Sequence, residues 1–521
     1  MTRITLSFAA ILLALSMFSR AMAEDKTFIQ TVRVPEDASL DEIVTLSTRV
    51  LPHPRQMIWH RDEFIAFIHY GPNAFTRREW GSGGEDPNLF HPADLDTDQW
   101  CDTMKKAGIT RVVITAKHHD GFCLWQTRYT KHAVNSSRWR DGKGDVLRDL
   151  SKSCKKYGLK LGVYLSPADL HQIRDGGLYG NLSKYRKETI PTPVADRPFA
   201  DKRTFQYEVD DYNLYFMNQL FELLTEYGPI YECWFDGAHP KRKGGQTYNY
   251  KAWYEMIHTL APDAMIAVKG PDTRWCGNEA GGTRPTEYNV IPLTGDKFED
   301  ESWPDRRGGD LGSRARLAGA KWLHYYPAET NTSIRHGWFY RDDEKQGVRD
   351  ADSVFDIYER AVGGNSVFLL NVPPNREGTF SPRDVASLVE VGRRIRNVYG
   401  ASLTIGATGP AEVLDGDEAT FWQAENLSGE FEIRLAKPQR INRFLLQEPI
   451  ATQGQRIEAH ALDGWIDGEW REIATATTVG YKRILRFPAI HTDRLRVRIT
   501  TSRATPMISR ASAHCFGEPP N

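Results

Sequence analysis

The segment "IYECWFD" (residues 230–236) is a run of apolar and aromatic side chains that ends in a carboxylate, Asp236. A short run of this kind predicts a buried β-strand. An isolated charge is costly inside such a strand, so Asp236 at its end marks a position with a functional or structural purpose. The fold that contains this strand decides which.

Similar strands recur on both sides of it, separated by amphipathic helices. Between about residues 60 and 395 this alternation is typical of a parallel β/α architecture. The helical patterns at 97–108, 146–158 and 211–228 each end in a glycine, which suits a helix C-cap. The other predicted strands are "FIAFIHY" (64–70), "RVVITA" (111–116), "LKLGVYLS" (159–166), "AMIAVK" (264–269), "KWLHYYP" (321–327) and "SVFLLNV" (366–372). So many strands favour a TIM-like (β/α) barrel over an open sheet, and we assign residues 24–395 to it as the catalytic domain.

After about residue 400 the pattern changes to short strands separated by turns, with no helical period between them. The predicted strands here lie at 431–438, 440–449, 455–464, 469–480, 482–489 and 494–502. This pattern predicts an all-β sandwich over residues 400–521.

The ends and the composition of the chain limit its location and its partners. Residues 1–23 have a basic start, an apolar run and an Ala-x-Ala ending, as a secretory signal peptide does. No later segment is long and apolar enough for a spanning helix, so we expect a periplasmic or secreted protein. Lys+Arg of 67 against Asp+Glu of 68, without a basic block, does not indicate nucleic acid as a partner.

The cysteines and histidines do not form a metal-ligand pattern. Six cysteines, without Cys-x-x-Cys or Cys-plus-His spacing, are expected to be buried small hydrophobes. The adjacent His118 and His119 follow a predicted strand, and neighbouring side chains of a strand point to opposite sides. We therefore expect hydrogen bonds to a polar ligand, no metal site and no cofactor.

Polar residues follow several of the predicted strands, where active sites of barrels lie. From the residues alone, Asp236 could be a nucleophile in a partly dry pocket or a partner for an arginine of a loop. Hydrolysis of a glycoside with retention needs two carboxylates. "RWCGNEAGG" (274–282) offers Glu279 in a glycine-rich loop after the next strand, and "FIHYGPNAFTRREWG" (67–81) adds His69, Glu79 and Trp80.

Four motifs in this order, "FIHYGPNAF", "KHHDGFCLW", "YECWFDG" and "RWCGNEAGG", resemble glycoside hydrolase family 29, the retaining α-L-fucosidases. The resemblance implies that Asp236 is the nucleophile and Glu279 the acid/base, with Glu287, Glu299 and Asp300 as nearby rivals for the acid. The "EWG" and "GNE" motifs resemble the subfamily that prefers α-1,3/1,4-linked fucose on branched, Lewis-type glycans. By the same resemblance, the sugar pocket would be lined by His69, Glu79, Trp80, His118, His119, Trp234 and Trp338.

The segment 412–424 and the strands after it resemble a discoidin-like sandwich, also used as a carbohydrate-binding module. Sugar binding and packing against the barrel both remain open as its role. Expected partners are fucosylated oligosaccharides or glycoconjugates. Two alternatives remain: a secreted fucose-binding lectin or adhesin, and a retaining hydrolase of a related sugar such as an α-galactoside.

Overall fold

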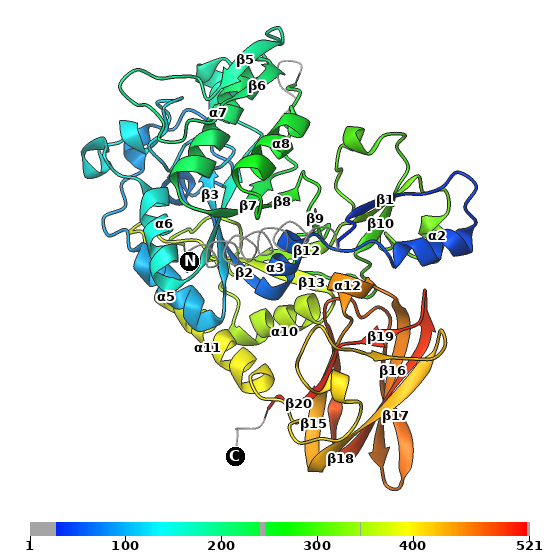
Figure 1. Cartoon of the computed structure of the whole chain (residues 1–521). Coiled ribbons are helices and arrows are strands. Elements are labelled where there is room, and N and C mark those ends of the chain that lie inside the picture. Colours follow the sequence, from blue (N-terminus) through cyan, green and yellow to red (C-terminus); the bar gives the residue numbers. More distant parts are fainter. Residues whose placement is uncertain (1–27, 240–244, 344, 518–521) are drawn as a thin grey trace, which may run out of the picture.

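The computed structural model describes residues 28–239, 245–343 and 345–517. Within these ranges, eight parallel strands form one sheet in the order β8-β7-β4-β3-β2-β13-β12-β9. A bridge between Ala267 and Thr273 links its two edge strands, so the sheet is a nearly closed TIM-like barrel (Figure 1). Its strands are β2 (Phe64–Ile68), β3 (Arg111–Lys117), β4 (Lys160–Leu165), β7 (Ile230–Phe235), β8 (Met265–Val268), β9 (Arg274–Trp275), β12 (Ala328–Ser333) and β13 (Ser366–Asn371).

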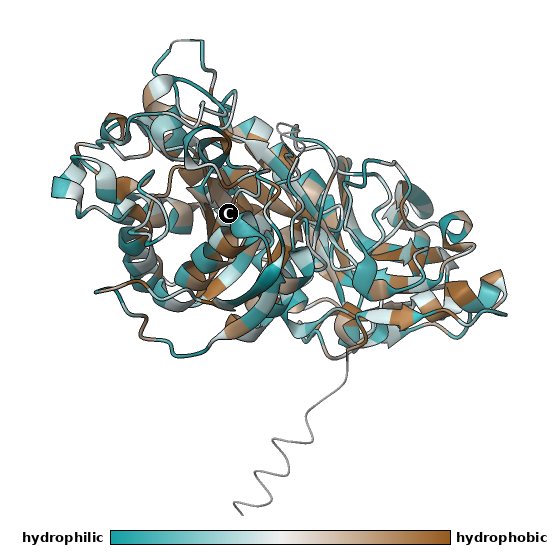
Figure 2. Cartoon of the chain, turned by 90° about the horizontal axis from the view of Figure 1, so that it is seen from above, coloured by the Kyte–Doolittle hydropathy of each residue, from teal (hydrophilic) through white to brown (hydrophobic). Residues whose placement is uncertain are grey.

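Helices cover the outside of this barrel and bury one face against it. In α5 (Thr97–Ala107) and α6 (Val146–Tyr157) an Asp N-cap begins the helix, and a glycine in the left-handed region ends it, as the sequence predicts. Figure 2 shows hydrophobic residues concentrated toward the middle of the barrel. The other helices of at least eight residues are α2 (Leu40–Ser47), α3 (Pro54–Asp62), α7 (Asp211–Glu226), α8 (Tyr250–Leu260), α10 (Ala351–Val362) and α11 (Pro382–Tyr399). The shorter ones are α4 (Pro72–Thr76), α9 (Arg314–Leu317) and α12 (Ile450–Gln453).

One predicted barrel strand belongs elsewhere. Residues 321–327 form β11 (Trp322–Tyr325), which pairs antiparallel with β1 (Thr31–Arg33) and β10 (Val290–Leu293) in a separate three-stranded sheet. The barrel strand of this region is the next one, β12, whose sequence "AETNTS" has no apolar run. It is nevertheless buried, and hydrogen bonds within the barrel satisfy several of its polar side chains; the hydroxyl of Thr330, for example, lies 2.8 Å from that of Ser366. A hairpin of β5 (Arg186–Ile190) and β6 (Phe205–Val209) projects from the barrel.

The C-terminal region is all-β, as the sequence predicts. Up to residue 517, where the description ends, it has a five-stranded antiparallel sheet, β17-β16-β18-β15-β20, and a two-stranded sheet, β14-β19, around their own hydrophobic core. Two pairs of predicted short strands are continuous: β15 and β18 each bend at irregularities in their pairing instead of stopping. The bounds are β14 (Trp422–Gln423), β15 (Gly429–Gln447), β16 (Ile457–Ile466), β17 (Glu469–Ala476), β18 (Arg483–Ser502), β19 (Met507–Ile508) and β20 (Arg510–His514).

The C-terminal region packs beside the amino ends of β2 and β13. Lys482 forms an ion pair with Glu63, directly before β2. Asn365, directly before β13, accepts a hydrogen bond from the backbone N–H of Tyr481 at 2.8 Å. Arg443 pairs with Glu359 of α10 at 2.6 Å. The carboxyl ends of the barrel strands remain uncovered by this contact.

The cysteines are placed largely as expected. Five are buried and Cys515 is half-buried. Among the described residues, no helix is long and apolar enough to cross a membrane. The predicted signal peptide, residues 1–23, lies outside the described residues.

Candidate active site

A cavity of about 300 Å³ lies at the carboxyl ends of the barrel strands. The nine residues that the family resemblance assigns to the site all line it: His69, Glu79, Trp80, His118, His119, Trp234, Asp236, Glu279 and Trp338. Trp234 lies within β7, and Trp338 lies in the loop between β12 and α10. The other seven lie in the segments that follow β2, β3, β7 and β9. The structure therefore brings the whole predicted set together at the rim where barrel active sites lie.

Asp236 follows β7 directly, and three groups orient its carboxylate. One oxygen, Oδ1, accepts a hydrogen bond from the backbone N–H of Ala238 at 2.8 Å, and Oδ2 accepts from the hydroxyl of Tyr164 at 3.1 Å. Nε2 of His119 lies 3.7 Å from Oδ2. Among the described residues, no lysine or arginine forms an ion pair with Asp236. Its side chain keeps 30% exposure, so it is held in place yet open to the cavity.

The three histidines line the cavity as buried, neutral rings. Burial lowers the pKa of His69 to about 3 and holds the pKa of His118 well below its usual value. Burial also lowers the pKa of His119, although the charge of Asp236 opposes this shift. Nδ1 of His69 lies 2.9 Å from Oδ1 of Asn371, and Nδ1 of His119 lies 2.7 Å from the hydroxyl of Ser166. At neutral pH these rings can exchange hydrogen bonds with a ligand without adding positive charge.

Trp234 lines the cavity, and contacts with two residues fix the position of its indole ring. Its indole Nε1 donates to Oε1 of Glu329 at 2.8 Å, and its ring stacks on Tyr164. Glu329 is buried on β12, and burial next to Glu232 raises the pKa of Glu329 well above its usual value. A neutral carboxylic acid thus supports the indole within the barrel.

Glu79, Trp80 and Trp338 form another wall. The backbone N–H of Trp338 donates to Oε2 of Glu79 at 2.8 Å, which ties the first loop to the loop after β12. The ring of Trp80 packs against His119 with centroids 4.2 Å apart, yet 47% of Trp80 is exposed. A large exposed indole at a cavity is suited to contact a ligand.

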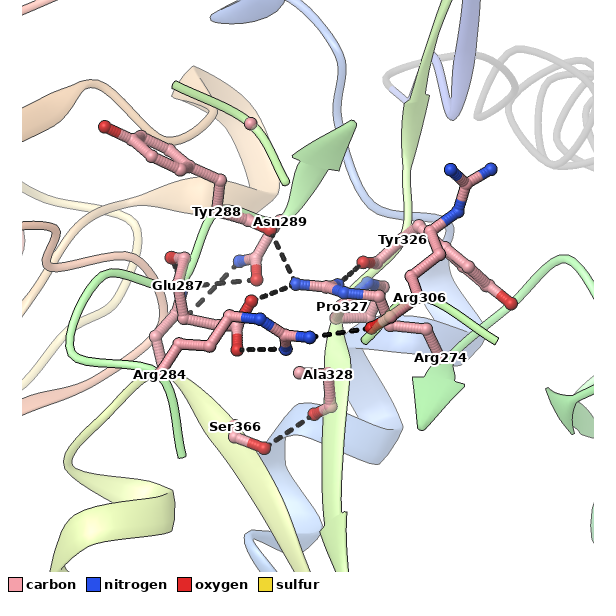
Figure 3. Close-up of polar contacts among 12 residues, drawn as sticks. Arg274, Arg284, Glu287, Tyr288, Asn289, Arg306, Tyr326, Pro327, Ala328 and Ser366 are labelled. Atoms are coloured by element: carbon pink, nitrogen blue, oxygen red, sulfur yellow. Dashed lines mark hydrogen bonds and ion pairs between the residues drawn. The ribbon is translucent and has the colours of Figure 1, made fainter. Parts of the chain in front are cut away.

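Glu279 lies on the loop between β9 and β10. Burial and then the negative charge of Asp236 raise its pKa, while the indole of Trp338 and the charge of Arg307 oppose the shift. The rivals Glu287, Glu299 and Asp300 do not line the cavity. Glu287 is buried in ion pairs with Arg274 and Arg284, as Figure 3 shows, and Glu299 and Asp300 belong to a single 3₁₀ turn. Of these four acids, Glu279 is the one placed to act in the cavity.

The sequence did not predict several of the residues that line the cavity. Tyr164 lies two residues before the end of the predicted strand 159–166, so a search for polar groups after strand ends does not reach it. The other lining residues without a distinctive spacing are Phe67, Gly237, Ala238, Val268, Trp275, Asp305, Arg307 and Asn331. Among the described residues, no group of three or more His, Cys, Asp or Glu side chains could hold a metal ion.

Comparison with known proteins identifies the class. The family model for α-L-fucosidase matches residues 68–400, and the F5/8 type C domain, a discoidin-like fold, matches residues 400–512. The chain therefore belongs to the α-L-fucosidase family, glycoside hydrolase family 29, and is an enzyme of this class.

Similarity to individual proteins supports the same family assignment. The chain is 35% identical over 500 residues to α-L-fucosidase 1 of Arabidopsis thaliana, covering 90% of each protein. A crystal structure assigned as an α-L-fucosidase from Bacteroides ovatus superposes with a TM-score of 0.80 at 38% identity, covering 95% of this chain and 79% of that one. The Ruminococcus gnavus family 29 fucosidase in complex with fucose gives a TM-score of 0.73 at 27% identity, covering 90% of this chain and 95% of that one.

Proposed function

We propose that this α-L-fucosidase is an exo-acting, retaining enzyme in which Asp236 is the nucleophile and Glu279 the general acid/base. The observation that carries the proposal is the shared cavity: both carboxylates line it, and Asp236 is oriented by hydrogen bonds without a neutralising lysine or arginine among the described residues. A carboxylate in that setting stays nucleophilic. The cavity of about 300 Å³ suits one terminal sugar ring.

The reaction is a double displacement. Asp236 attacks the anomeric carbon while Glu279 donates its proton to the glycosidic oxygen, which leaves with the rest of the glycan. This gives a covalent fucosyl ester on Asp236. Glu279, now a carboxylate, takes a proton from water, the water attacks the anomeric carbon, and Asp236 is released.

The electrostatics of the pair suit both halves of this cycle. Before the first step, burial and the charge of Asp236 raise the pKa of Glu279, which favours its protonated form. In the ester Asp236 carries no charge, so one of the causes of the raised pKa disappears. The pKa of Glu279 then falls, which favours the ionised carboxylate that the second step needs as its general base.

The walls of the cavity supply groups for a fucose ring. Nδ1 of His118 and Oε1 of Glu79 are buried polar atoms without a hydrogen-bond partner among the described residues. Ring hydroxyls can satisfy such atoms. The indoles of Trp234 and Trp338 offer apolar faces for the C5 methyl group.

We further propose a preference for α-1,3/1,4-linked fucose on branched, Lewis-type glycans. Its support is the resemblance of the "EWG" and "GNE" motifs, whose Glu79, Trp80 and Glu279 all line the cavity. Release of fucose from a panel of Lewis-type and α-1,2-fucosylated oligosaccharides tests this preference. Faster release from the α-1,2-linked members would overturn it.

Two further measurements test the alternatives. Initial rates on an aryl α-L-fucoside and an aryl α-galactoside separate the fucosidase from a hydrolase of a related sugar, and we expect turnover of the fucoside to dominate. Binding of fucose by the wild-type protein without hydrolysis of any fucoside would instead support a lectin.

We also propose a periplasmic or secreted location, on the basis of the signal-peptide pattern of residues 1–23. Export with cleavage after Ala23 predicts a mature protein that begins at Glu24. Amino-terminal sequencing of the exported protein tests this, and an intact Met1 start in the periplasm or medium would contradict it.

A further inference from the structure

Arg284 lies at the junction of two loops that line the active site. Its side chain is only 8% exposed although it projects from a loop. Nη2 donates to the carbonyl oxygen of Arg306 at 2.7 Å, and Nε donates to the carbonyl oxygen of Gly308 at 2.7 Å. Figure 3 shows the Arg284 side chain reaching across to Arg306. One guanidinium thus holds the backbone of the 306–308 segment at two points.

The first of the two loops is the one that carries Glu279. Arg284 belongs to it, and its guanidinium also lies against Gly277, two residues before Glu279. A Cβ atom at Gly277 would stand 3.4 Å from Nη2 of Arg284 and 3.2 Å from Cα of Arg307. Gly277 has a φ of +97°, so the close approach and the left-handed backbone both favour glycine there. The backbone around Glu279 therefore packs directly on Arg284 and Arg307.

The second loop carries Asp305 and Arg307, which line the cavity. The side chain of Arg307 is 69% exposed, and its guanidinium carbon lies 5.1 Å from the ring centroid of Trp275. Arg307 is also a charge that lowers the pKa of Glu279. The hydrogen bonds of Arg284 thus set where this loop stands relative to the proposed acid.

Glu287 fixes the position of Arg284, and the C-terminal region in turn fixes the position of Glu287. Oε2 of Glu287 accepts from Nη1 of Arg284 at 3.2 Å, and its other oxygen pairs with Arg274. The backbone N–H of Glu287 donates to the hydroxyl of Thr478 at 3.2 Å, and Gln455 donates to the Glu287 carbonyl oxygen at 3.0 Å. Contacts with both the barrel and the C-terminal region therefore hold the loop that carries Glu279 in position.

We propose that Arg284 is a positioning residue for the general acid, which it serves by fixing the Glu279 loop to the 305–308 loop. The proposal rests on the role of Glu279 given above. It assigns to Arg284 no contact with the substrate. Displacement of a catalytic group by about 1 Å can cost on the order of 100-fold in rate, so a backbone clamp at this junction has a large effect on proton donation.

The test compares kcat/KM on two substrates, because this ratio reports the steps up to departure of the leaving group. A Lewis-type trisaccharide needs protonation of its leaving oxygen, and an aryl α-L-fucoside with an acidic phenol needs little. The variants are Arg284→Gln and Arg284→Lys, made in the full chain. Lysine keeps the charge beside Glu287 but lacks the planar fork that serves both carbonyl oxygens. Arg393→Gln is the matched control, since Arg393 pairs with Glu390 on α11 and is 57% exposed.

We expect both Arg284 variants to lose about 10- to 100-fold in kcat/KM on the trisaccharide and less than about threefold on the activated aryl fucoside, while Arg393→Gln matches the wild type. An equal loss on both substrates would mean a merely structural role and would overturn the proposal, as would no loss on either. If Arg284→Gln does not fold, the losses in kcat/KM on the two substrates are compared in Arg284→Lys alone, and the same outcomes apply.

Glu279→Gln, assayed alongside, separates this proposal from the proposed function. If Glu279→Gln itself shows no substrate dependence, the acid is another residue, and the proposed function fails together with the role of Arg284. If Glu279→Gln is selective against the trisaccharide and the Arg284 variants are not, only the role of Arg284 is wrong.

Discussion

The two sides of the active-site cavity are built differently. On one side, His69, His118, His119, Tyr164 and Asp236 stand at or directly after the ends of central barrel strands, and all but Asp236 are buried. On the other, Glu79, Trp80, Glu279, Asp305 and Arg307 stand on loops and are half-buried or exposed. The proposed nucleophile, Asp236, belongs to the first side and the proposed acid, Glu279, to the second.

This difference separates two tasks. Packing in the barrel fixes the strand-end side, which holds the proposed nucleophile, and burial keeps its histidines neutral. The loop side holds the proposed acid, and its position depends on polar contacts such as those of Arg284. Substitution of Asp236 should therefore affect every substrate, and substitution of Glu279 or Arg284 should depend on the leaving group.

The largest effect is expected for Asp236→Ala. Loss of the nucleophile should lower kcat/KM on the order of 10⁴-fold or more, equally for an aryl α-L-fucoside and a Lewis-type glycan, because both need the same attack. Asp305→Ala is the control, since Asp305 lines the same cavity from the loop side. Near-normal turnover by Asp236→Ala, or an equal loss in Asp305→Ala, would contradict the assignment.

Glu279→Gln should follow, with a loss that depends on the substrate. We expect about 10²- to 10⁴-fold lower kcat/KM on glycans, the usual contribution of general acid catalysis, and much less on an activated aryl fucoside. The raised pKa of Glu279 also predicts that the alkaline limb of the wild-type kcat/KM profile on glycans lies above the ordinary carboxyl range and disappears in Glu279→Gln. If the alkaline limb is still present in Glu279→Gln, another residue is the general acid.

Trp80→Ala should have a smaller effect. An exposed indole beside His119 contributes contact area to the ligand, and we expect about a three- to tenfold loss in kcat/KM with no change in thermal stability, since stacking contacts of this kind contribute about 1 kcal/mol. Leu427→Ala, an exposed apolar residue in the C-terminal region, is the control. A drop in melting temperature specific to Trp80→Ala would show that the indole supports the fold instead.

The smallest effect on activity is expected at a buried histidine away from the cavity, where the change is in stability. Burial lowers the pKa of His460 in the C-terminal region to about 3. Because its pKa is ordinary in the unfolded chain, its contribution to stability is complete above about pH 6.5 and is lost as pH falls toward 3, by at most about 1.4 kcal/mol per pH unit. Urea unfolding at pH 7 and pH 5 should show a shallower decrease in His460→Gln than in wild type. His91→Gln, at an exposed position, should retain the wild-type slope; equal slopes in all three proteins would contradict the account.

Sequence patterns predict those parts of the molecule whose signal is local. Apolar runs such as "SVFLLNV" locate β13, and the polar residues after such runs lead to His69, His118, His119 and Asp236. The sequence pattern does not predict β12, because most of its buried side chains are polar and the pattern has no apolar period. Partners such as Ser366 for Thr330 are distant in sequence. The strand at 321–327 is a real strand assigned to the wrong sheet, because periodicity does not reveal the pairing partner.

The loop side of the site is harder to predict for the same reason. Glu279 is located through its motif, but the sequence leaves Glu287, Glu299 and Asp300 as nearby rivals; only the structure shows that Glu287 is committed to Arg274 and Arg284. Arg284 itself acts through backbone carbonyls of Arg306 and Gly308, which no side-chain pattern can encode. The domain limits at residues 23 and 395 and the individual roles of the site residues stay predictions.

Asp236 is proposed to form a covalent bond to fucose, and trapping of the fucosyl-enzyme intermediate is the decisive experiment. The wild-type protein is incubated with a fluorinated α-L-fucosyl substrate that forms the ester quickly and hydrolyses slowly, then digested and analysed by mass spectrometry. We expect one fluorofucosyl group on the peptide that contains Asp236, and no adduct in Asp236→Ala. An adduct on another residue of the wild-type protein, or turnover of the substrate with inversion and no adduct, would contradict it.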